Sequence, residues 1–310
     1  MTVTNTELTE ILTGLRLPQK MVSPKYFYDE RGSQLFDQIT RLPEYYPTET
    51  ELGIMLDNMA EIVALAGKQA SLIEFGSGSS RKTRALLDSL KQQAVYVPVD
   101  ISEAHLLASA EKIRAEHSGL EVLPVVADFT KPFALPSPTI MPLRNIVYFP
   151  GSTIGNFTHE AAHDLLEVMY QEAGQDGALL IGVDLQKDTE IIERAYNDSV
   201  GITAEFNLNM LTHLNREFDF DFDVDAFAHS AHYDKTEGRM EISLVSKREQ
   251  IVTTGDEKIT VADGESILTE YSHKYTLDGF REMASNAGFE VKRVWTDADA
   301  LFSVQYCCRG

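Results

Sequence analysis

Short apolar runs alternate with longer segments of helical periodicity over most of the chain, from about residue 52 onward. These segments follow one another in the order helix 52–67, strand 71–75, helix 82–92, strand 95–99, helix 102–117, strand 121–126, strand 145–149, helix 159–173 and strand 178–183. Strands that are apolar on both faces are typical of a parallel sheet that helices cover on both sides. The pattern therefore predicts an α/β domain with a doubly wound sheet.

The end of the chain departs from this alternation. A helix at residues 277–287 leads into two strand-like runs, 290–295 and 301–307, which only residues 296–300 separate. A connection this short permits an antiparallel hairpin, because a parallel crossover needs about a dozen residues or more. A mostly parallel sheet that closes with a hairpin resembles the class I methyltransferase fold, whereas typical nicotinamide-binding folds keep the last strand parallel.

Two segments, residues 24–50 and 187–274, lie outside the alternating pattern. We predict that residues 51–186 and 275–310 form the domain with the doubly wound sheet and bind the cofactor. Residues 1–50 and 187–274 are predicted to form a smaller α+β lid domain that binds the substrate. The run FDFDFD at 218–223 lacks the glycine and the final glutamate of a calcium loop, so we interpret it as a solvated, amphipathic edge.

Composition argues against several classes of protein. The chain of 310 residues has 48 acidic and 27 basic side chains and a formal net charge of -21, so we expect it to bind neither nucleic acid nor an anionic membrane. No stretch looks like a secretory signal or approaches the roughly 20 apolar residues of a membrane helix, which predicts a cytoplasmic protein. The two cysteines, Cys307 and Cys308, are neighbours and are predicted to be reduced.

A glycine-rich turn, Gly76-Ser77-Gly78, directly follows the first strand of the predicted sheet. Glycine lets the backbone approach a ligand closely and tolerates positive φ. The third glycine of the dinucleotide fingerprint is missing, since Arg81 stands in its place, which argues against a bound pyrophosphate. Asp100 ends the second strand, where a carboxylate can accept hydrogen bonds from both ribose hydroxyls. The spacing predicts an adenosine-type ligand.

Further side chains at the same edge of the sheet suit S-adenosylmethionine. Glu74 precedes the glycines, and Asp128 and Phe129 follow the third strand, where an acid beside an aromatic ring can hydrogen-bond and stack on an adenine. Acidic groups also complement the cationic sulfonium and amino group of this molecule. Its carboxylate could pair with Lys82, although an exposed helical lysine remains the alternative interpretation.

Several blocks of sequence carry a family resemblance over nearly the whole chain. They are KYFYD at 25–29, LFDQITRLPEYYPT at 35–48, EFGSG at 74–78 with KTR at 82–84, GSTIGN at 151–156, RAY at 194–196 and LTEYS at 268–272. With these blocks the chain resembles the histidine Nα-methyltransferases of ergothioneine biosynthesis. The reaction that the resemblance implies is three successive methylations of L-histidine, through its mono- and dimethyl forms. We expect the protein to be a monomer and to use no metal.

The resemblance also implies two sets of binding residues. S-adenosylmethionine would be held by Gly76, Lys82, Asp100, Asp128 and Phe129, and the amino acid by Tyr45, Asn156, Tyr196, Glu270, Tyr271 and Ser272. Asn156 and Tyr196 would bind the α-amino and carboxylate groups, and Glu270, Ser272 and Tyr45 would face the imidazole. Tyr28 would orient the amine, with Phe36 beside it. The sequence departs from the family pattern at Ile242, where methionine is expected, and this residue bears on the choice of acceptor.

Other interpretations stay open at this point. His159, Glu160 and His163 reproduce the HExxH pattern of zinc peptidases, although the same residues suit an ordinary helix start after Thr158. A sensor that binds S-adenosylmethionine without catalysis, and an Nα-methyltransferase of another aromatic amino acid, are the remaining alternatives. The aromatic residues of the acceptor set could also be ordinary core residues.

Overall fold

The computed structural model describes residues 5–77, 81–90 and 94–310. The chain divides into two compact units, each built from two separate stretches. We call residues 47–186 with 274–310 the large unit, and residues 1–46 with 187–273 the small unit. None of the described helices combines the length and the apolar character that crossing a membrane requires.

The large unit contains a mixed sheet with the strand order β13-β14-β7-β6-β2-β3-β4, and β5 also pairs with β3. Its strands are β2 (Ala70–Phe75), β3 (Val95–Asp100), β4 (Glu121–Val122), β5 (Val125–Val126), β6 (Arg144–Phe149), β7 (Ala178–Asp184), β13 (Phe289–Thr296) and β14 (Phe302–Arg309). The strands from β2 to β7 are parallel, whereas β14 runs antiparallel to both β7 and β13. The predicted α/β class is confirmed.

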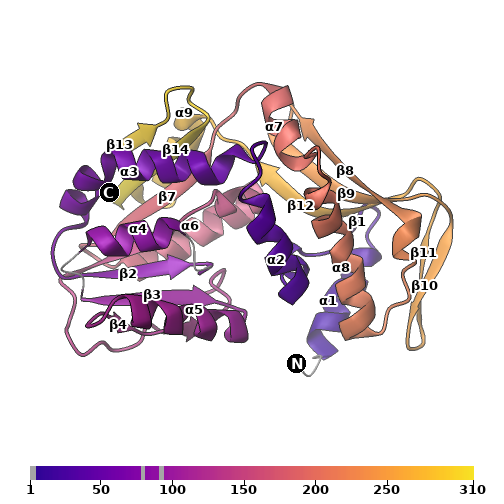
Figure 1. The fold of residues 1–310 in the computed structure, drawn as a ribbon, viewed down its shortest axis with the longest axis horizontal. Coiled ribbons are helices and arrows are strands. Elements are labelled where there is room, and N and C mark those ends of the chain that lie inside the picture. Colours follow the sequence, from indigo (N-terminus) through magenta and orange to yellow (C-terminus); the bar gives the residue numbers. More distant parts are fainter. Residues whose placement is uncertain (1–4, 78–80, 91–93) are drawn as a thin grey trace. The chain divides into compact units, whose positions relative to one another are not determined.

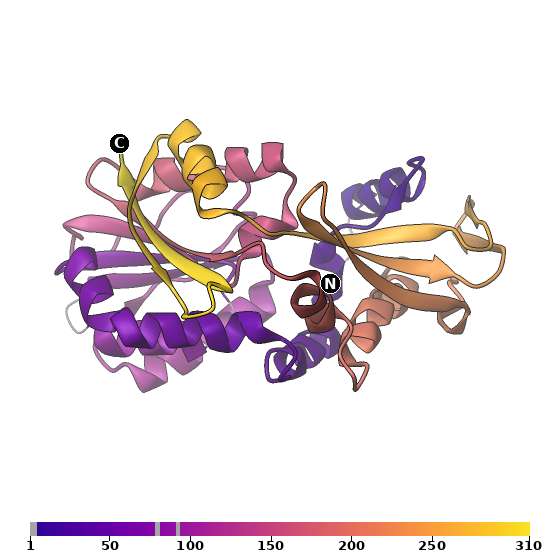
Figure 2. The same ribbon diagram turned by 90° about the horizontal axis from the view of Figure 1, so that it is seen from above.

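Helices cover both faces of this sheet, as the alternating sequence pattern predicts. They are α3 (Tyr46–Ala66), α4 (Arg81–Ser89), α5 (Glu103–Glu116), α6 (His159–Ala173) and α9 (Leu277–Asn286), with a short 3-10 helix η2 (Thr153–Asn156). Figure 2 shows α3, α4 and α5 on one face and α6 and α9 on the other. Two apolar clusters fill the space between the sheet and these two helical layers.

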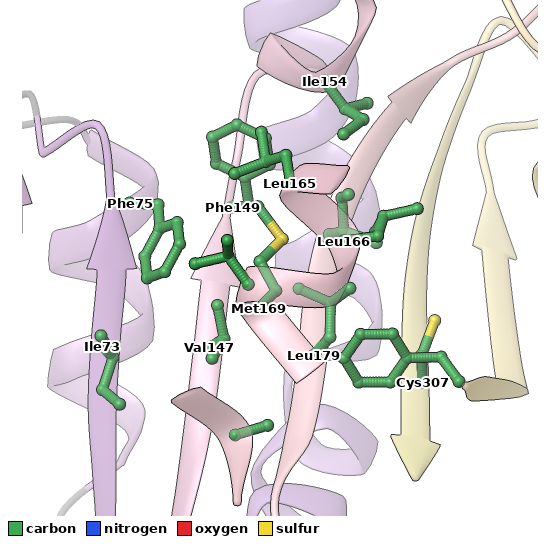
Figure 3. Close-up of a cluster of buried hydrophobic side chains, with 14 of the residues drawn as sticks. Ile73, Phe75, Val147, Phe149, Ile154, Leu165, Leu166, Met169, Leu179 and Cys307 are labelled. Atoms are coloured by element: carbon green, nitrogen blue, oxygen red, sulfur yellow. The ribbon is translucent and has the colours of Figure 1, made fainter. Parts of the chain in front are cut away.

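The cluster beneath α6 and α9 holds the carboxyl ends of the central strands in place. Phe75 and Phe149 lie at the ends of β2 and β6, and Leu166 and Met169 of α6 pack against the same cluster (Figure 3). Cys307 is one of its fully buried members and is a free thiol, whose pKa burial raises. Tight packing leaves these strand ends little freedom to move, so the loops that follow them start from fixed points.

The third predicted strand differs from the observed structure. Residues 121–126 form two short strands, β4 and β5, rather than one. Leu123 still donates to the carbonyl of Tyr96, at 2.9 Å, but Pro124 comes next and has no N–H to continue the ladder. The first predicted helix also begins earlier, at Tyr46, because Pro47 is tolerated in a first helical turn.

The small unit combines helices with a second sheet (Figure 1). Its elements are α1 (Asn5–Leu15), β1 (Lys20–Met21), η1 (Pro24–Phe27), α2 (Glu30–Ile39), α7 (Thr189–Tyr196), α8 (Ile202–Phe218), η3 (Val224–Ala226), β8 (Phe227–Asp234), β9 (Arg239–Ser246), β10 (Gln250–Thr254), β11 (Glu257–Val261) and β12 (Ser266–His273). The sheet order is β1-β12-β9-β8, and β10 and β11 form a separate antiparallel hairpin. Helix α8 packs on α2 and on β8.

The FDFDFD run begins at Phe218, the last residue of α8, and continues as an irregular segment. Phe220 and Phe222 are buried in the core of the small unit, whereas Asp219 and Asp221 are exposed. Asp221 accepts hydrogen bonds from the backbone and the hydroxyl of Thr253 in the β10–β11 hairpin. The alternation of the run therefore ties the hairpin to the core.

Candidate functional site

The predicted cofactor loop begins directly after β2. Gly76 has a φ of +72°, and the N–H groups of Gly76 and Ser77 donate to the carbonyl of Val99 at 2.9 and 3.2 Å. A Cβ on Gly76 would lie 3.6 Å from the ring of Phe129, so the bare backbone and this ring are neighbours. Glycine is therefore required here for its positive φ. Gly78 and Ser79, which belong to the same predicted loop, lie outside the described residues.

Glu74 lies beneath this loop and does not face solvent. Its carboxylate accepts hydrogen bonds from the hydroxyls of Thr83, at 2.6 Å, and Tyr96. The Tyr96 oxygen is also 3.2 Å from the hydroxyl of Ser77. Burial raises the pKa of Glu74 to about 7, although the hydrogen bonds from Thr83 and Tyr96 act in the opposite direction. Glu74 thus joins β2, β3 and α4 at the base of the loop.

Two further predicted residues lie at the carboxyl ends of neighbouring strands. Asp100, the last residue of β3, accepts from the N–H of Ser102 at 2.8 Å, and burial raises its pKa. Burial alone would also raise the pKa of Asp128, but hydrogen bonds from Thr130 and Lys131 outweigh it and lower the pKa. Asp128 is therefore an ionised acceptor beside the Phe129 ring. The large unit brings Gly76, Asp100, Asp128 and Phe129 to one edge of its sheet.

Lys82 forms a buried ion pair that the sequence alone does not reveal. Its ammonium group, on the first turn of α4, donates to the carboxylate of Glu51 on α3, and the two residues are 7% and 0% exposed. The same carboxylate accepts from the N–H of Gly151, at 2.9 Å. The sequence does give a weak indication that Glu51 is buried. Glu51 shares a helix face with the buried residues Ile54 and Met55, at spacings of three and four.

The loop after β6 carries Asn156. Gly151 and Ser152 both adopt positive φ, +81° and +58°, and the Ser152 hydroxyl accepts from the N–H of Asp184 at 2.9 Å. A left-handed conformation is uncommon for a residue other than glycine and often marks a functional turn. The turn leads into η2, at whose end Asn156 is half-buried. Asn156 therefore belongs to the large unit, unlike the other predicted acceptor residues.

The small unit gathers most of the predicted acceptor residues on one face of its sheet. The hydroxyls of Tyr196, at the end of α7, and Ser272, on β12, are 2.8 Å apart. Glu270 is the cross-strand partner of Ile242 on β9, and Ile242 belongs to the apolar cluster that contains Tyr196. Ile242 thus lies on the same face as Glu270.

A row of aromatic rings extends from this face. Tyr45 contacts Tyr196 with its ring centroid 6.2 Å away, and Phe36 lies 6.4 Å from Tyr45. Tyr28 continues the row, 5.7 Å from Phe36 and edge-on to it. Phe206 of α8 packs against the last two rings of the row, at 5.8 Å from Tyr28 and 6.0 Å from Phe36. The aromatic residues of the predicted set are therefore continuous in space.

Tyr271 lies apart from this group. Because side chains alternate along a strand, Tyr271 is on the opposite face from Glu270 and Ser272. There it lines a cavity of about 420 Å³ with Glu241 and Leu268, and its ring stacks 3.9 Å from the guanidinium carbon of Arg239. The structure does not bring the Tyr271 side chain together with the other predicted acceptor residues.

The HExxH residues lie in the first turns of α6. Thr158 caps this helix by accepting from the N–H of Ala161 at 3.3 Å, and the ring of His159 lies 6.4 Å from that of Tyr275. Within the described residues, the group that could ligate a metal is His163 with the exposed acids Asp164 and Glu167. His159 is not part of that group, so the two histidines of the pattern do not form a common site.

Comparison with known proteins identifies the family of the chain. A family model described as "Histidine-specific methyltransferase, SAM-dependent" matches residues 7–309. The chain is 39% identical to "Histidine N-alpha-methyltransferase" of Mycolicibacterium smegmatis, over 97% of this chain and 94% of that protein. It is 30% identical to "Ergothioneine biosynthesis protein 1" of Neurospora crassa, over 94% of this chain and 33% of that protein.

Solved structures supply the comparison of folds. An S-adenosylmethionine-dependent methyltransferase from Clostridium acetobutylicum aligns with a TM-score of 0.51, covering 90% of this chain and 98% of the other. At 8% sequence identity this likeness concerns the fold alone. It agrees with the class I sheet expected from the sequence.

Proposed function

The chain belongs to the family of S-adenosylmethionine-dependent, histidine-specific methyltransferases, and from this premise we propose that it trimethylates the α-amino group of L-histidine. The product is histidine betaine, also called hercynine, and the reaction is the first step of ergothioneine biosynthesis. The observation that carries the proposal is the match of the family model to residues 7–309, which include both sets of residues described above. The net charge of -21 agrees with a small-molecule substrate rather than nucleic acid, and we place the reaction in the cytoplasm, in a monomer.

The residues at the sheet edge of the large unit fit S-adenosylmethionine. Gly76 leaves bare backbone beside the Phe129 ring, which suits a flat adenine, and Asp100 ends β3 at the position of a ribose acceptor. The ionised Asp128 adds a hydrogen-bond acceptor beside the ring. Lys82 would hold the carboxylate of the bound molecule while remaining paired with Glu51. When bound, S-adenosylmethionine supplies an electrophilic methyl group.

The acceptor residues supply complementary chemistry for histidine. Glu270 can accept a hydrogen bond from an imidazole N–H in either protonation state of the ring. We assign the imidazole to Glu270, Ser272 and Tyr45, and the α-amino and carboxylate groups to Asn156 and Tyr196. The hydrogen bond between the Tyr196 and Ser272 hydroxyls supports this assignment, because it holds the two oxygen atoms close together on one face of the small unit.

Methyl transfer to an amine requires a neutral nitrogen that is held in line with the methyl group. We propose that Tyr28 orients this amine through its hydroxyl and that no covalent intermediate forms. Tyr28 and Phe36 also present ring faces, which stabilise a nitrogen that ends as a quaternary cation. Tyr28→Phe should therefore slow turnover moderately. A complete loss of activity with intact histidine binding would contradict the orienting role.

The decisive experiment offers the purified enzyme and S-adenosylmethionine a panel of amino acids and identifies the products by mass spectrometry. Mono-, di- and trimethylated histidine should appear in succession. The absence of methylated histidine, while another amino acid is methylated, would refute the proposed acceptor. Binding of S-adenosylmethionine without methylation of any panel member would favour a sensor.

Two substitutions test the role of Glu270. Glu270→Ala should reduce the preference for histidine over tryptophan. With the wrong substrate the Glu270 carboxylate would lack a hydrogen-bond partner, and this cost is what disfavours that substrate in the wild type. Glu249→Ala is the matched control, since this glutamate is exposed in the turn after β9 of the same unit. An unchanged preference in Glu270→Ala would show that the assignment is wrong.

A second candidate, Nα-methylation of another aromatic amino acid, is favoured by one observation. Ile242 lies directly across from Glu270 on β9, so its branched side chain shapes the acceptor face. The same panel distinguishes this candidate, because the preferred acceptor would then be an amino acid other than histidine.

A further inference from the structure

A buried polar cluster lies beside the acceptor residues, on the same face of the small unit's sheet. It consists of Asn207 on α8, His229 on β8 and Thr269 on β12, and Asn207 and Thr269 are each 1% exposed. None of the three belongs to the binding sets described above. Buried polar groups are costly unless their hydrogen bonds are satisfied, so an ordered cluster of this kind needs an explanation.

Thr269 is the extra residue of a β-bulge. The pairing of β12 with β9 shifts register between Leu268 and Glu270, and Leu268 pairs with Ser243 while Glu270 pairs with Ile242. The Thr269 hydroxyl oxygen lies 3.0 Å from the Ile242 carbonyl oxygen, so this side chain packs directly against the bulge. A bulge changes which face the following residues occupy. It therefore aims Glu270 and Ser272 at the acceptor face.

Asn207 stabilises the bulge from the side of α8. Its Nδ2 donates to the Ser243 carbonyl at 3.0 Å, and its Oδ1 accepts from the Thr269 hydroxyl at 2.8 Å. A carbonyl can only accept, so the contact with Ser243 determines which end of the amide carries the nitrogen. The second N–H of this nitrogen then points to Nδ1 of His229, which is 2.9 Å away.

The hydrogen bonds of His229 are determined in turn. Because Nδ1 faces the donor of Asn207, it must accept, and the ring proton resides on Nε2. Nε2 lies 2.9 Å from the carbonyl of Tyr196, to which it donates. Tyr196 is the last residue of α7, and the final carbonyls of a helix lack partners within the helix. His229 thus caps α7 at the residue whose hydroxyl meets Ser272.

We propose that Asn207 and His229 are positioning residues for the amino-acid acceptor. His229 holds the backbone of Tyr196, and Asn207 holds the bulge that aims Glu270 and Ser272. One continuous hydrogen-bond network therefore fixes the positions of both Tyr196 and Ser272, whose hydroxyls form a hydrogen bond. The inference rests on the proposed function and adds two residues that act through their neighbours.

The test compares steady-state kinetics of full-length variants with direct binding. His229→Leu and Asn207→Leu should each raise the KM for histidine roughly tenfold or more, because each removes at least two hydrogen bonds of the network. The KM for S-adenosylmethionine and the affinity for S-adenosylhomocysteine should change less than about threefold. His229→Gln should restore most of the histidine KM, because its amide can still donate to the Tyr196 carbonyl.

His232→Leu is the matched control. This histidine lies on the same strand, β8, but its side chain is 61% exposed and faces the opposite side of the sheet, near Glu241. It should behave like the wild type. If His229→Leu does not fold, Thr269→Val provides a nearly isosteric variant that removes only the hydroxyl and should raise the histidine KM in the same direction.

Three outcomes would overturn the inference. The first is an unchanged histidine KM in the folded variants, and the second is an equal weakening of both substrates together with a lower Tm, which would indicate a purely structural role. The third is a wild-type enzyme that does not methylate histidine, which would refute the proposed function and this inference with it. Wild-type activity alongside an unchanged KM in the variants refutes the positioning role alone.

Discussion

Glu74→Gln should change how the stability of the protein depends on pH. Glu74 is fully buried at the end of β2, and burial raises its pKa from 4.5 to about 7 against the hydrogen bonds from Thr83 and Tyr96. A carboxyl whose pKa is raised in the folded state binds its proton more tightly there than in the unfolded chain. Its favourable contribution is therefore complete below pH 4.5 and is lost as the pH rises to about 7.

The magnitude follows from the two pKa values. One pKa unit corresponds to about 1.4 kcal/mol, so the shift from 4.5 to about 7 amounts to about 3 kcal/mol in full, and roughly 2.5 kcal/mol of this is lost between about pH 5 and 8. Glutamine at position 74 does not titrate. The free energy of unfolding of the wild type, relative to that of Glu74→Gln, should fall by this amount over that range.

Urea denaturation at a series of pH values measures this difference. The single tryptophan, Trp295 on β13, belongs to the same unit as Glu74, so its fluorescence reports the unfolding of the relevant part. Glu249→Gln replaces an exposed glutamate and should follow the wild-type curve. Parallel pH profiles for wild type and Glu74→Gln would refute the reasoning.

Two further predictions concern the buried pair of Glu51 and Lys82. Gly182→Ala would place a Cβ 2.3 Å from the Glu51 carboxylate, and the crowding should lower the free energy of unfolding by about 1–3 kcal/mol. Gly53→Ala, whose Cβ meets nothing within 4 Å, is the control and should not destabilise. Lys82→Met should cost about 3–5 kcal/mol in urea denaturation, because it leaves the Glu51 carboxylate buried without its cation. The double variant with Glu51→Leu should recover much of this loss, and a double variant as unstable as Lys82→Met would contradict the account.

Much of the large unit could be predicted because its signals are local. The apolar runs that became β2 and β7 are buried along their whole length, and those of β3 and β6 are buried except at one end, as the parallel-sheet interpretation requires. The break between β4 and β5 was also visible in the sequence, at Pro124, but the surrounding apolar residues outweighed it in the prediction. The turn glycine Gly76 has the positive φ that its position after a strand suggested.

The sequence by itself determined the α/β class, the elements of the sheet and, through family blocks, the reaction class. These follow from side-chain periodicity and backbone sterics, which act over a few neighbouring residues. Only the tertiary structure decided that Glu51 meets Lys82, that Glu74 turns inward, and that the bulge at Thr269 places Leu268 and Glu270 on opposite faces of the sheet. The burial of a charge and the face of a strand residue depend on what distant segments place beside it, and local periodicity does not carry that information.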